Sequence, residues 1–133
     1  MKNILFTLLL ASILLAACST SASNQATAQV TIDGIKEFKI SMSHSGGYSP
    51  NSFTVNKGDT VRFLANNMQP QHKHGITIDA YSIDTEVDAG PNDAPQVIEF
   101  KADKAGQFKI WCKTCLEGPF GDHPWMQGTL TVN

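Results

Sequence analysis

Short segments in which apolar and polar residues alternate constrain the fold of this chain more than any other feature. One such run occupies residues 37–43, where Phe38, Ile40 and Met42 alternate with more polar neighbours. Similar runs occur at 53–55, 61–65, 75–83, 96–102, 106–112 and 128–133, and clusters of Gly, Pro, Asn and Asp separate them. Alternation of period two is typical of strands with one buried face, and a series of short ones predicts a β-sandwich.

The N-terminal segment differs in composition from the rest of the chain. One lysine precedes an apolar run over residues 4–17, which is too short for a comfortable membrane span and is typical of a signal peptide. The run ends in Leu15-Ala16-Ala17-Cys18, which resembles a bacterial lipobox. We therefore expect a lipoprotein signal peptide over 1–17, acylation of Cys18, and extracytoplasmic anchoring to a bacterial membrane. The alternative is an ordinary signal peptide with an incidental cysteine.

Residues 18–29 and 30–133 are expected to be a tether and a single domain. After Cys18, the tether is rich in Ser, Thr, Ala, Asn and Gln and cannot bury a core, so we predict a short disordered linker. The remainder has the length of one domain. Hydrophobic residues make up 41% of the chain, charged residues 17%, and the formal net charge is −2. No basic run suggests a nucleic-acid partner.

A cluster of soft metal ligands stands just before the last predicted strand. Cys112, Cys115, His123 and Met126 fall in one loop, and His74 precedes an upstream strand. Thiolate, imidazole and thioether donors together select copper over hard cations. A disulfide between the two cysteines, which an oxidising compartment permits, and a structural zinc site are the alternatives.

Three further residues are candidates for a supporting role around that site. His72 lies two residues from His74, so both side chains of an extended segment point to the same face. Trp111 and Trp125 flank the cluster in sequence, and a dry aromatic shell tunes the potential of a metal centre.

Several segments resemble cupredoxins, which are Greek-key β-sandwiches that carry copper in respiratory electron transfer. "VNKGDTVRF" resembles the strand-turn-strand segment of that family, and "HGITIDAYSID" is similar to a strand of nitrosocyanin. "IEFKADKAGQFKIWC" resembles a run seen in nitrosocyanin, in the CuA domain of nitrous oxide reductase and, more loosely, in cytochrome oxidase subunit II. The resemblance implies an all-β, Greek-key, cupredoxin-like domain that binds copper.

The resemblance also implies a ligand set. CuA loops read Cys-x3-Cys-x3-His-x2-Met with an upstream histidine, and both thiolates bridge two coppers. His74, Cys112, Cys115, His123 and Met126 match these ligands in type and order, but the first gap is x2 and the second is x7. Nitrosocyanin instead has one copper held by a cysteine, two histidines and a glutamate. We expect one or two copper ions per chain and favour the dinuclear form, with a mononuclear cysteinate site as the alternative.

The expected function is electron transfer by a membrane-anchored copper protein that is not itself an enzyme. Its partner would be a redox protein such as a cytochrome c, or a terminal oxidase or reductase. An acidic segment over 79–93 is either a solvated face or a surface that steers a basic partner. The alternative function is an extracytoplasmic copper chaperone or buffer that supplies copper to a respiratory oxidase.

Overall fold

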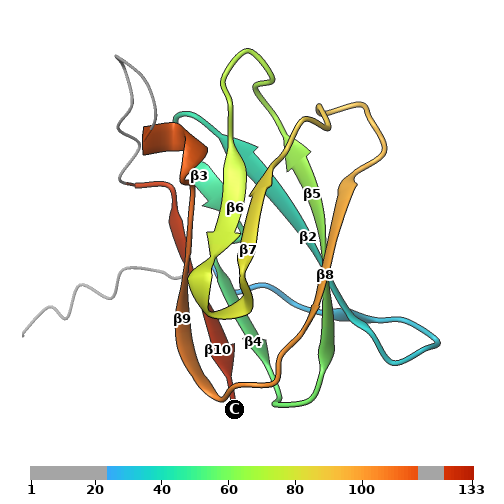
Figure 1. The fold of residues 1–133 in the computed structure, drawn as a ribbon. Coiled ribbons are helices and arrows are strands. Elements are labelled where there is room, and N and C mark those ends of the chain that lie inside the picture. Colours follow the sequence, from blue (N-terminus) through green and yellow to red (C-terminus); the bar gives the residue numbers. More distant parts are fainter. Residues whose placement is uncertain (1–23, 117–124) are drawn as a thin grey trace, which may run out of the picture.

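The computed structural model describes residues 24–116 and 125–133. These residues form two five-stranded β-sheets packed face to face (Figure 1). The strands are β1 (Gln29–Val30), β2 (Lys36–Ser43), β3 (Gly47–Ser49), β4 (Ser52–Val55), β5 (Thr60–Asn67), β6 (Gly75–Ile78), β7 (Ile83–Glu86), β8 (Gln96–Lys101), β9 (Gly106–Trp111) and β10 (Gln127–Val132). Two short 3-10 helices, η1 (Asp79–Tyr81) and η2 (Thr114–Leu116), complete the described elements. The predicted all-β fold is confirmed.

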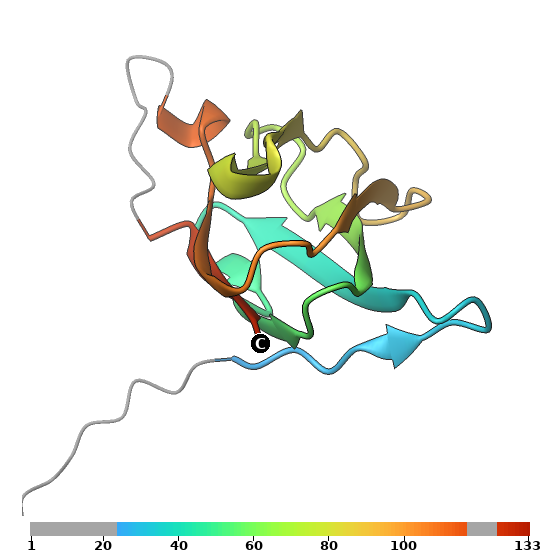
Figure 2. The ribbon, with the colours of Figure 1, turned by 60° about the horizontal axis from the view of Figure 1, so that its bottom comes forward.

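The two sheets have crossed connections. One has the order β1-β2-β5-β8, with β3 also paired to β2, and the other has the order β4-β10-β9-β6-β7. β2 runs parallel to β5, and β4 runs parallel to β10, although the other strand pairs are antiparallel. Parallel neighbours need crossover connections, and here the chain between each parallel pair includes at least one strand of the other sheet, as in a Greek-key sandwich. Figure 2 shows the two layers from the end that carries the C-terminus.

The core lies between the sheets and is rich in aromatic side chains. Phe38 and Phe63 come from one sheet and Phe53 from the other, and each is at most 1% exposed. Their ring centroids are 4.9–6.0 Å apart with tilted or edge-to-face geometry. Burial of such rings supplies a large share of the hydrophobic stabilisation of a domain of this size. Phe38 in β2 and Phe63 in β5 lie at positions that the period-two alternation predicted to be buried.

The alternating run over 75–83 contains one complete strand and the start of the next. β6 begins directly after His74, as expected, and ends at Ile78, and η1 follows before β7. Ser82 adopts a left-handed conformation with φ of 53°, which reverses the chain and lets β7 pair with β6 as a hairpin.

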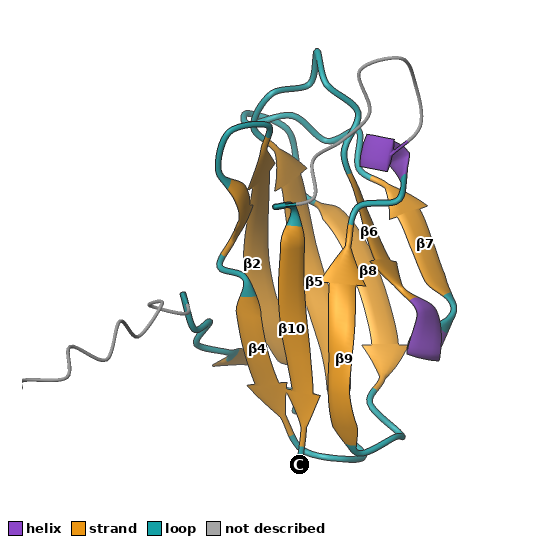
Figure 3. Cartoon of the chain, turned by 90° about the vertical axis from the view of Figure 1, so that its left-hand side faces the viewer, coloured by secondary structure: helices purple, strands orange, loops and turns teal. Residues whose placement is uncertain are grey.

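The ends of three central strands meet at one end of the sandwich. β6 begins there, β9 ends there and β10 begins there, opposite the end that carries the C-terminus (Figures 1 and 3). Gln127 of β10 pairs with Trp111 of β9, and Thr77 of β6 also pairs with Trp111. Within the described part of the chain, no helix is long and apolar enough to cross a bilayer.

Candidate metal centre

Four soft donors predicted from the sequence lie together at that end of the sandwich. His74 precedes β6, Cys112 follows β9, Cys115 lies in η2, and Met126 precedes β10. His74 is completely buried, and the other three are at most 3% exposed. Because β6, β9 and β10 are neighbours in one sheet, their ends deliver these side chains to one point.

The distances between the donor atoms are short. The ligand atoms of His74, Cys112 and Cys115 all lie within 4.8 Å of one another. His74 Nδ1 is 3.4 Å from Cys115 Sγ, and Cys115 Sγ is 3.4 Å from Met126 Sδ. One imidazole nitrogen and three sulfur atoms therefore meet in a dry site, and this donor chemistry fits copper.

In this structure Cys112 and Cys115 are joined by a disulfide. This is one of the two states expected for the pair, and it is the oxidised one. Only thiolates bind a metal through sulfur in the manner of a cysteine ligand. Reduction of the disulfide by two electrons, followed by loss of both thiol protons, would release two sulfur ligands at the same place.

Hydrogen bonds fix the position of Cys112. The Gly75 N–H donates to Cys112 Sγ at 3.3 Å, and the Thr114 hydroxyl lies 3.4 Å from the same sulfur. The buried Tyr48 hydroxyl donates to the Gly75 carbonyl at 2.6 Å, and burial raises the pKa of Tyr48. Donors aimed at a cysteine sulfur favour its charged form and tune a bound metal. Gly75 itself has no room for a side chain, since an added Cβ would lie 2.8 Å from the Thr85 carbonyl oxygen.

Two lysines next to the donors are paired with carboxylates of β7. Lys73 Nζ is 2.8 Å from Glu86 Oε1, and Lys113 Nζ is 2.7 Å from Asp84 Oδ2. The hydrogen bond and charge of Lys113 hold the pKa of Asp84 below its usual value. These ion pairs reduce the negative potential of the acidic segment over 79–93. The steering of a basic partner by this segment stays a prediction.

The remaining predicted site residues are placed as follows. The ring of His72 lies nearly parallel to that of His74, with centroids 6.3 Å apart. Trp111 is half-buried and its indole N–H donates to Asp79, whereas Trp125 is 53% exposed. Cys18 and His123 lie outside the described residues. Metal ligation by His123, acylation of Cys18 and the supporting role of His72, Trp111 and Trp125 stay predictions.

The sequence analysis did not single out His44. Its ring stacks on His72 with centroids 4.4 Å apart, and its carbonyl accepts a hydrogen bond from the Trp125 indole at 2.9 Å. His44 follows β2 and His72 follows β5. No local pattern reveals this contact, because it depends on the parallel pairing of β2 with β5.

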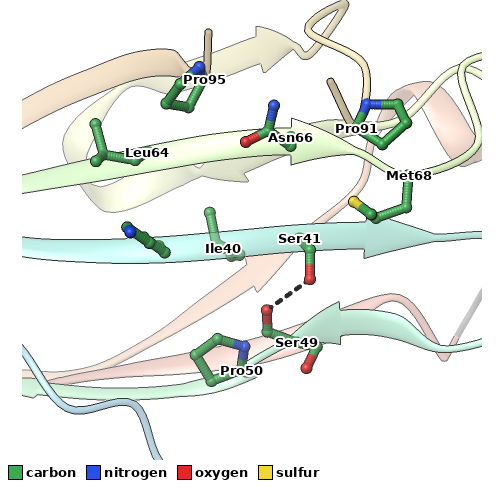
Figure 4. A pocket seen from close by; sticks show the side chains of 10 residues that line it. Ile40, Ser41, Ser49, Pro50, Leu64, Asn66, Met68, Pro91 and Pro95 are labelled. Carbon is green, nitrogen blue, oxygen red and sulfur yellow. Dashed lines mark hydrogen bonds between the residues drawn. The ribbon is translucent and has the colours of Figure 1, made fainter. Parts of the chain in front are cut away.

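A surface pocket of about 440 Å³ is separate from this cluster. It lies against β2 and β5, and among its lining residues are Ser41, Pro50, Leu64 and Met68 (Figure 4). Ser41 donates a hydrogen bond to the Ser49 carbonyl at its edge. None of the four metal-donor candidates lines this pocket.

Comparison with known proteins identifies a family and a fold. The family described as the cupredoxin-like domain matches residues 7–132. No curated protein sequence matches the chain. Among solved structures, the metal-binding domain of the Cu(I)-exporting P-type ATPase of Streptococcus pneumoniae, in a complex with Cu(I), is similar with a TM-score of 0.63 and 19% identity. The alignment covers 84% of this chain and 97% of that domain.

Two other similar structures are those of a heme-copper terminal oxidase and a blue copper protein. A heme-copper terminal oxidase dimer contains a chain that aligns with a TM-score of 0.55 and 19% identity, covering 87% of this chain and 77% of that one. Auracyanin A, a blue copper protein of Chloroflexus aurantiacus, aligns with a TM-score of 0.53 and 23% identity. That alignment covers 75% of this chain and all of auracyanin A. At these identities the similarity establishes the fold alone.

Proposed function

This chain belongs to the cupredoxin-like domain family, and from that premise we propose that it is a copper-binding electron-transfer protein. The observation that carries the proposal is the meeting of His74, Cys112, Cys115 and Met126 in one buried cluster. A metal held in such a rigid, dry site changes its surroundings little when it gains or loses one electron. The fold suits the transfer of single electrons, and we do not propose an enzymatic reaction.

The four donors define which copper chemistry the site would support. The His74 imidazole suits both copper oxidation states, and the sulfur donors favour Cu(I). The Gly75 N–H directed at Cys112 Sγ stabilises negative charge on that sulfur. Copper bound here would supply a one-electron redox couple, provided that the two cysteines are reduced first.

The finer proposal is a dinuclear, CuA-like centre. It is supported by the presence of two cysteines where a mononuclear carrier needs one, and by the order of the ligand types in the sequence. The described residues form a single cluster with one histidine, so a second imidazole would have to come from His123. The mononuclear cysteinate site is the alternative.

Copper stoichiometry combined with electron paramagnetic resonance tests this proposal. The reduced protein is loaded with copper, and we expect two coppers per chain with hyperfine splitting from two equivalent nuclei. One copper with a four-line pattern would overturn the dinuclear form. Failure of the reduced protein to retain copper would overturn the proposed function itself.

Two substitutions sharpen the result. Cys115→Ser is expected to abolish the dinuclear signal and to leave at most one copper. Met126→Leu should alter the spectrum, because Met126 Sδ lies 3.4 Å from Cys115 Sγ. The matched control is Met68→Leu, since Met68 is 46% exposed and lies away from the cluster against β2 and β5. An unchanged spectrum in Met126→Leu would remove this thioether from the proposed ligand set.

A copper chaperone or buffer is the second candidate. The sulfur-rich donor set favours it, because three of the four clustered donor atoms are sulfur and soft ligands suit Cu(I). A chaperone would release Cu(I) to a copper-free oxidase domain, whereas an electron carrier would retain its copper through repeated oxidation and reduction. Dialysis against a Cu(I) chelator before and after redox cycling distinguishes the two.

The proposal extends to location and partner. The lipobox-like sequence supports acylation of Cys18 and anchoring outside the cytoplasm at a bacterial membrane. A protein held there would exchange electrons with a cytochrome c, or with a terminal oxidase or reductase. The sequence alone supports the anchor and the partner.

A further inference from the structure

Three histidine rings and one tryptophan form a row from the candidate metal centre toward the surface. The His74 ring is fully buried, and the His72 ring lies beyond it at a centroid distance of 6.3 Å and an interplanar angle of 27°. The His44 ring stacks on the His72 ring, with centroids 4.4 Å apart and an interplanar angle of 24°. The row ends at Trp125, whose ring meets that of His44 edge to face at 6.4 Å and is 53% exposed.

Hydrogen bonds from three segments hold this row in place. The Asn67 side chain, which is 2% exposed, donates to the His72 carbonyl at 2.7 Å and accepts from the Gln69 N–H at 3.0 Å. Gln69 in turn accepts from the His44 N–H through its side-chain oxygen at 2.6 Å. The Trp125 indole N–H donates to the His44 carbonyl at 2.9 Å. These hydrogen bonds therefore fix the backbone positions of the two segments that carry the stacked rings.

Burial of His74 raises the question of how electrons would reach a metal bound to it. Electron transfer falls steeply with distance, and it crosses van der Waals contacts between packed conjugated rings more readily than open gaps. His74 has no exposed surface of its own, so it cannot touch a redox partner directly. The rings of His72 and His44 provide packed conjugated groups between His74 and the exposed Trp125.

We propose that His72, His44 and Trp125 form the route by which single electrons pass between copper held at His74 and a redox protein at the surface. This inference rests on the proposed function and adds a route to it. The step would move one electron: the reduced copper centre would lose one electron, and the acceptor protein would gain it. No covalent bond forms or breaks, and no proton is transferred.

A second route is available and makes the proposal falsifiable. Trp111 directly precedes Cys112, is half-buried, donates its indole N–H to Asp79, and has the Lys109 ammonium 5.7 Å from its ring centroid. Electrons leaving by Cys112 and Trp111 would bypass the histidine row altogether. Trp111→Leu removes that ring and so tests the competing route.

The experiment is the rate of electron self-exchange between reduced and oxidised copper-loaded copies of the full chain, measured by nuclear magnetic resonance line broadening. For His72→Ala and His44→Ala we expect a fall of roughly tenfold, equivalent to about 1.4 kcal/mol in the apparent barrier. Copper content and the paramagnetic resonance spectrum should stay as in the parent protein. His44→Phe, which keeps an aromatic ring, should restore most of the rate, and Trp111→Leu should lower it less than either histidine-to-alanine substitution.

A second measurement needs no copper. In the metal-free protein, ring-current shifts of the His44 and His72 protons report whether the two rings stack, and His44→Ala should remove the shift at His72. Absence of these shifts in the parent protein would refute the row itself.

The possible outcomes distinguish failure of the electron route from failure of the proposed function. Equal self-exchange rates in the parent, His44→Ala and His72→Ala would overturn the route and leave the proposed function standing. A lower rate in Trp111→Leu alone would assign the route to Trp111. If His72→Ala loses copper, His44→Ala decides, because His44 is one ring further from the site. A parent protein that binds copper without exchanging electrons would refute the carrier function.

Discussion

Replacing Tyr48 with phenylalanine removes a single hydroxyl group that links the core to the candidate metal centre. Tyr48 is 3% exposed, and its hydroxyl donates to the Gly75 carbonyl at 2.6 Å. The N–H of the same glycine donates to Cys112 Sγ at 3.3 Å. A tyrosine hydroxyl ordinarily keeps its proton at neutral pH, and burial raises the pKa of Tyr48 further. Loss of this group should affect both stability and the site.

The expected size follows from burial. A hydrogen bond contributes about 0.5–1.5 kcal/mol net, but leaving a buried acceptor unsatisfied costs about 1–3 kcal/mol. Tyr48→Phe should therefore lower the free energy of unfolding by about 1–3 kcal/mol, since water cannot replace the hydroxyl in a closed core. For a domain near this size, each kcal/mol corresponds to roughly 4 °C in Tm.

Tyr81→Phe is the matched control because it makes the same chemical change at an exposed hydrogen bond. The Tyr81 hydroxyl donates to the Lys104 carbonyl at 2.9 Å, where water can take its place. We expect this substitution to cost less than about 0.5 kcal/mol. The assay is guanidinium denaturation of the copper-free protein with the disulfide intact in every variant. Equal losses for the two substitutions would refute the reasoning, as would a loss below about 0.5 kcal/mol for Tyr48→Phe.

Two further predictions concern the membrane anchor and a surface ion pair. Mass spectrometry of the membrane fraction should find an acylated Cys18 at the N-terminus and no residues 1–17, and a soluble mature protein that lacks Cys18 would contradict the anchor. Lys113→Gln should raise the pKa of Asp84 toward its ordinary value in a carboxyl titration followed by nuclear magnetic resonance, because Lys113 lowers it through a hydrogen bond and its charge. A carboxyl group whose pKa is lowered by folding stabilises the folded protein at pH values above its unfolded-state pKa. This stabilisation is lost as the pH falls through the pKa of the folded state, so the parent and the variant should have similar stabilities in acid. An unchanged Asp84 pKa would contradict that account.

The strands were predictable where one face is buried and the other is exposed to solvent. In β2, Phe38, Ile40 and Met42 are buried and Lys39 is exposed, which is the pattern that the alternation predicts. β3 and β7 were not expected as separate strands. β3 has only three residues, and β7 shows no clean alternation, since no residue of β7 is fully buried. Their positions depend on pairing with β2 and β6, which a single-sequence pattern does not contain.

The candidate metal centre was predictable because soft ligands can be recognised from their residue types alone. The sequence identified His74, Cys112, Cys115 and Met126, and the structure brings these four together. It did not identify His44, because the segment around it, "MSHSGGYSP", resembles no ligand motif. The pairing of β2 with β5 brings the chain after each of these strands to the same end of the sheet, where the two loops meet.

The spacing of the two cysteines explains why the sequence left their chemistry open. With two residues between them, the chain turns through η2, and both sulfur atoms arrive within reach of His74 Nδ1. The same turn that lets Cys112 and Cys115 approach a common metal also lets them form a disulfide, so geometry cannot separate the two outcomes. The two outcomes differ in the oxidation state of the cysteines, which a sequence does not specify. In an oxidising compartment, a reductant must therefore act on the disulfide before both thiolates can bind copper.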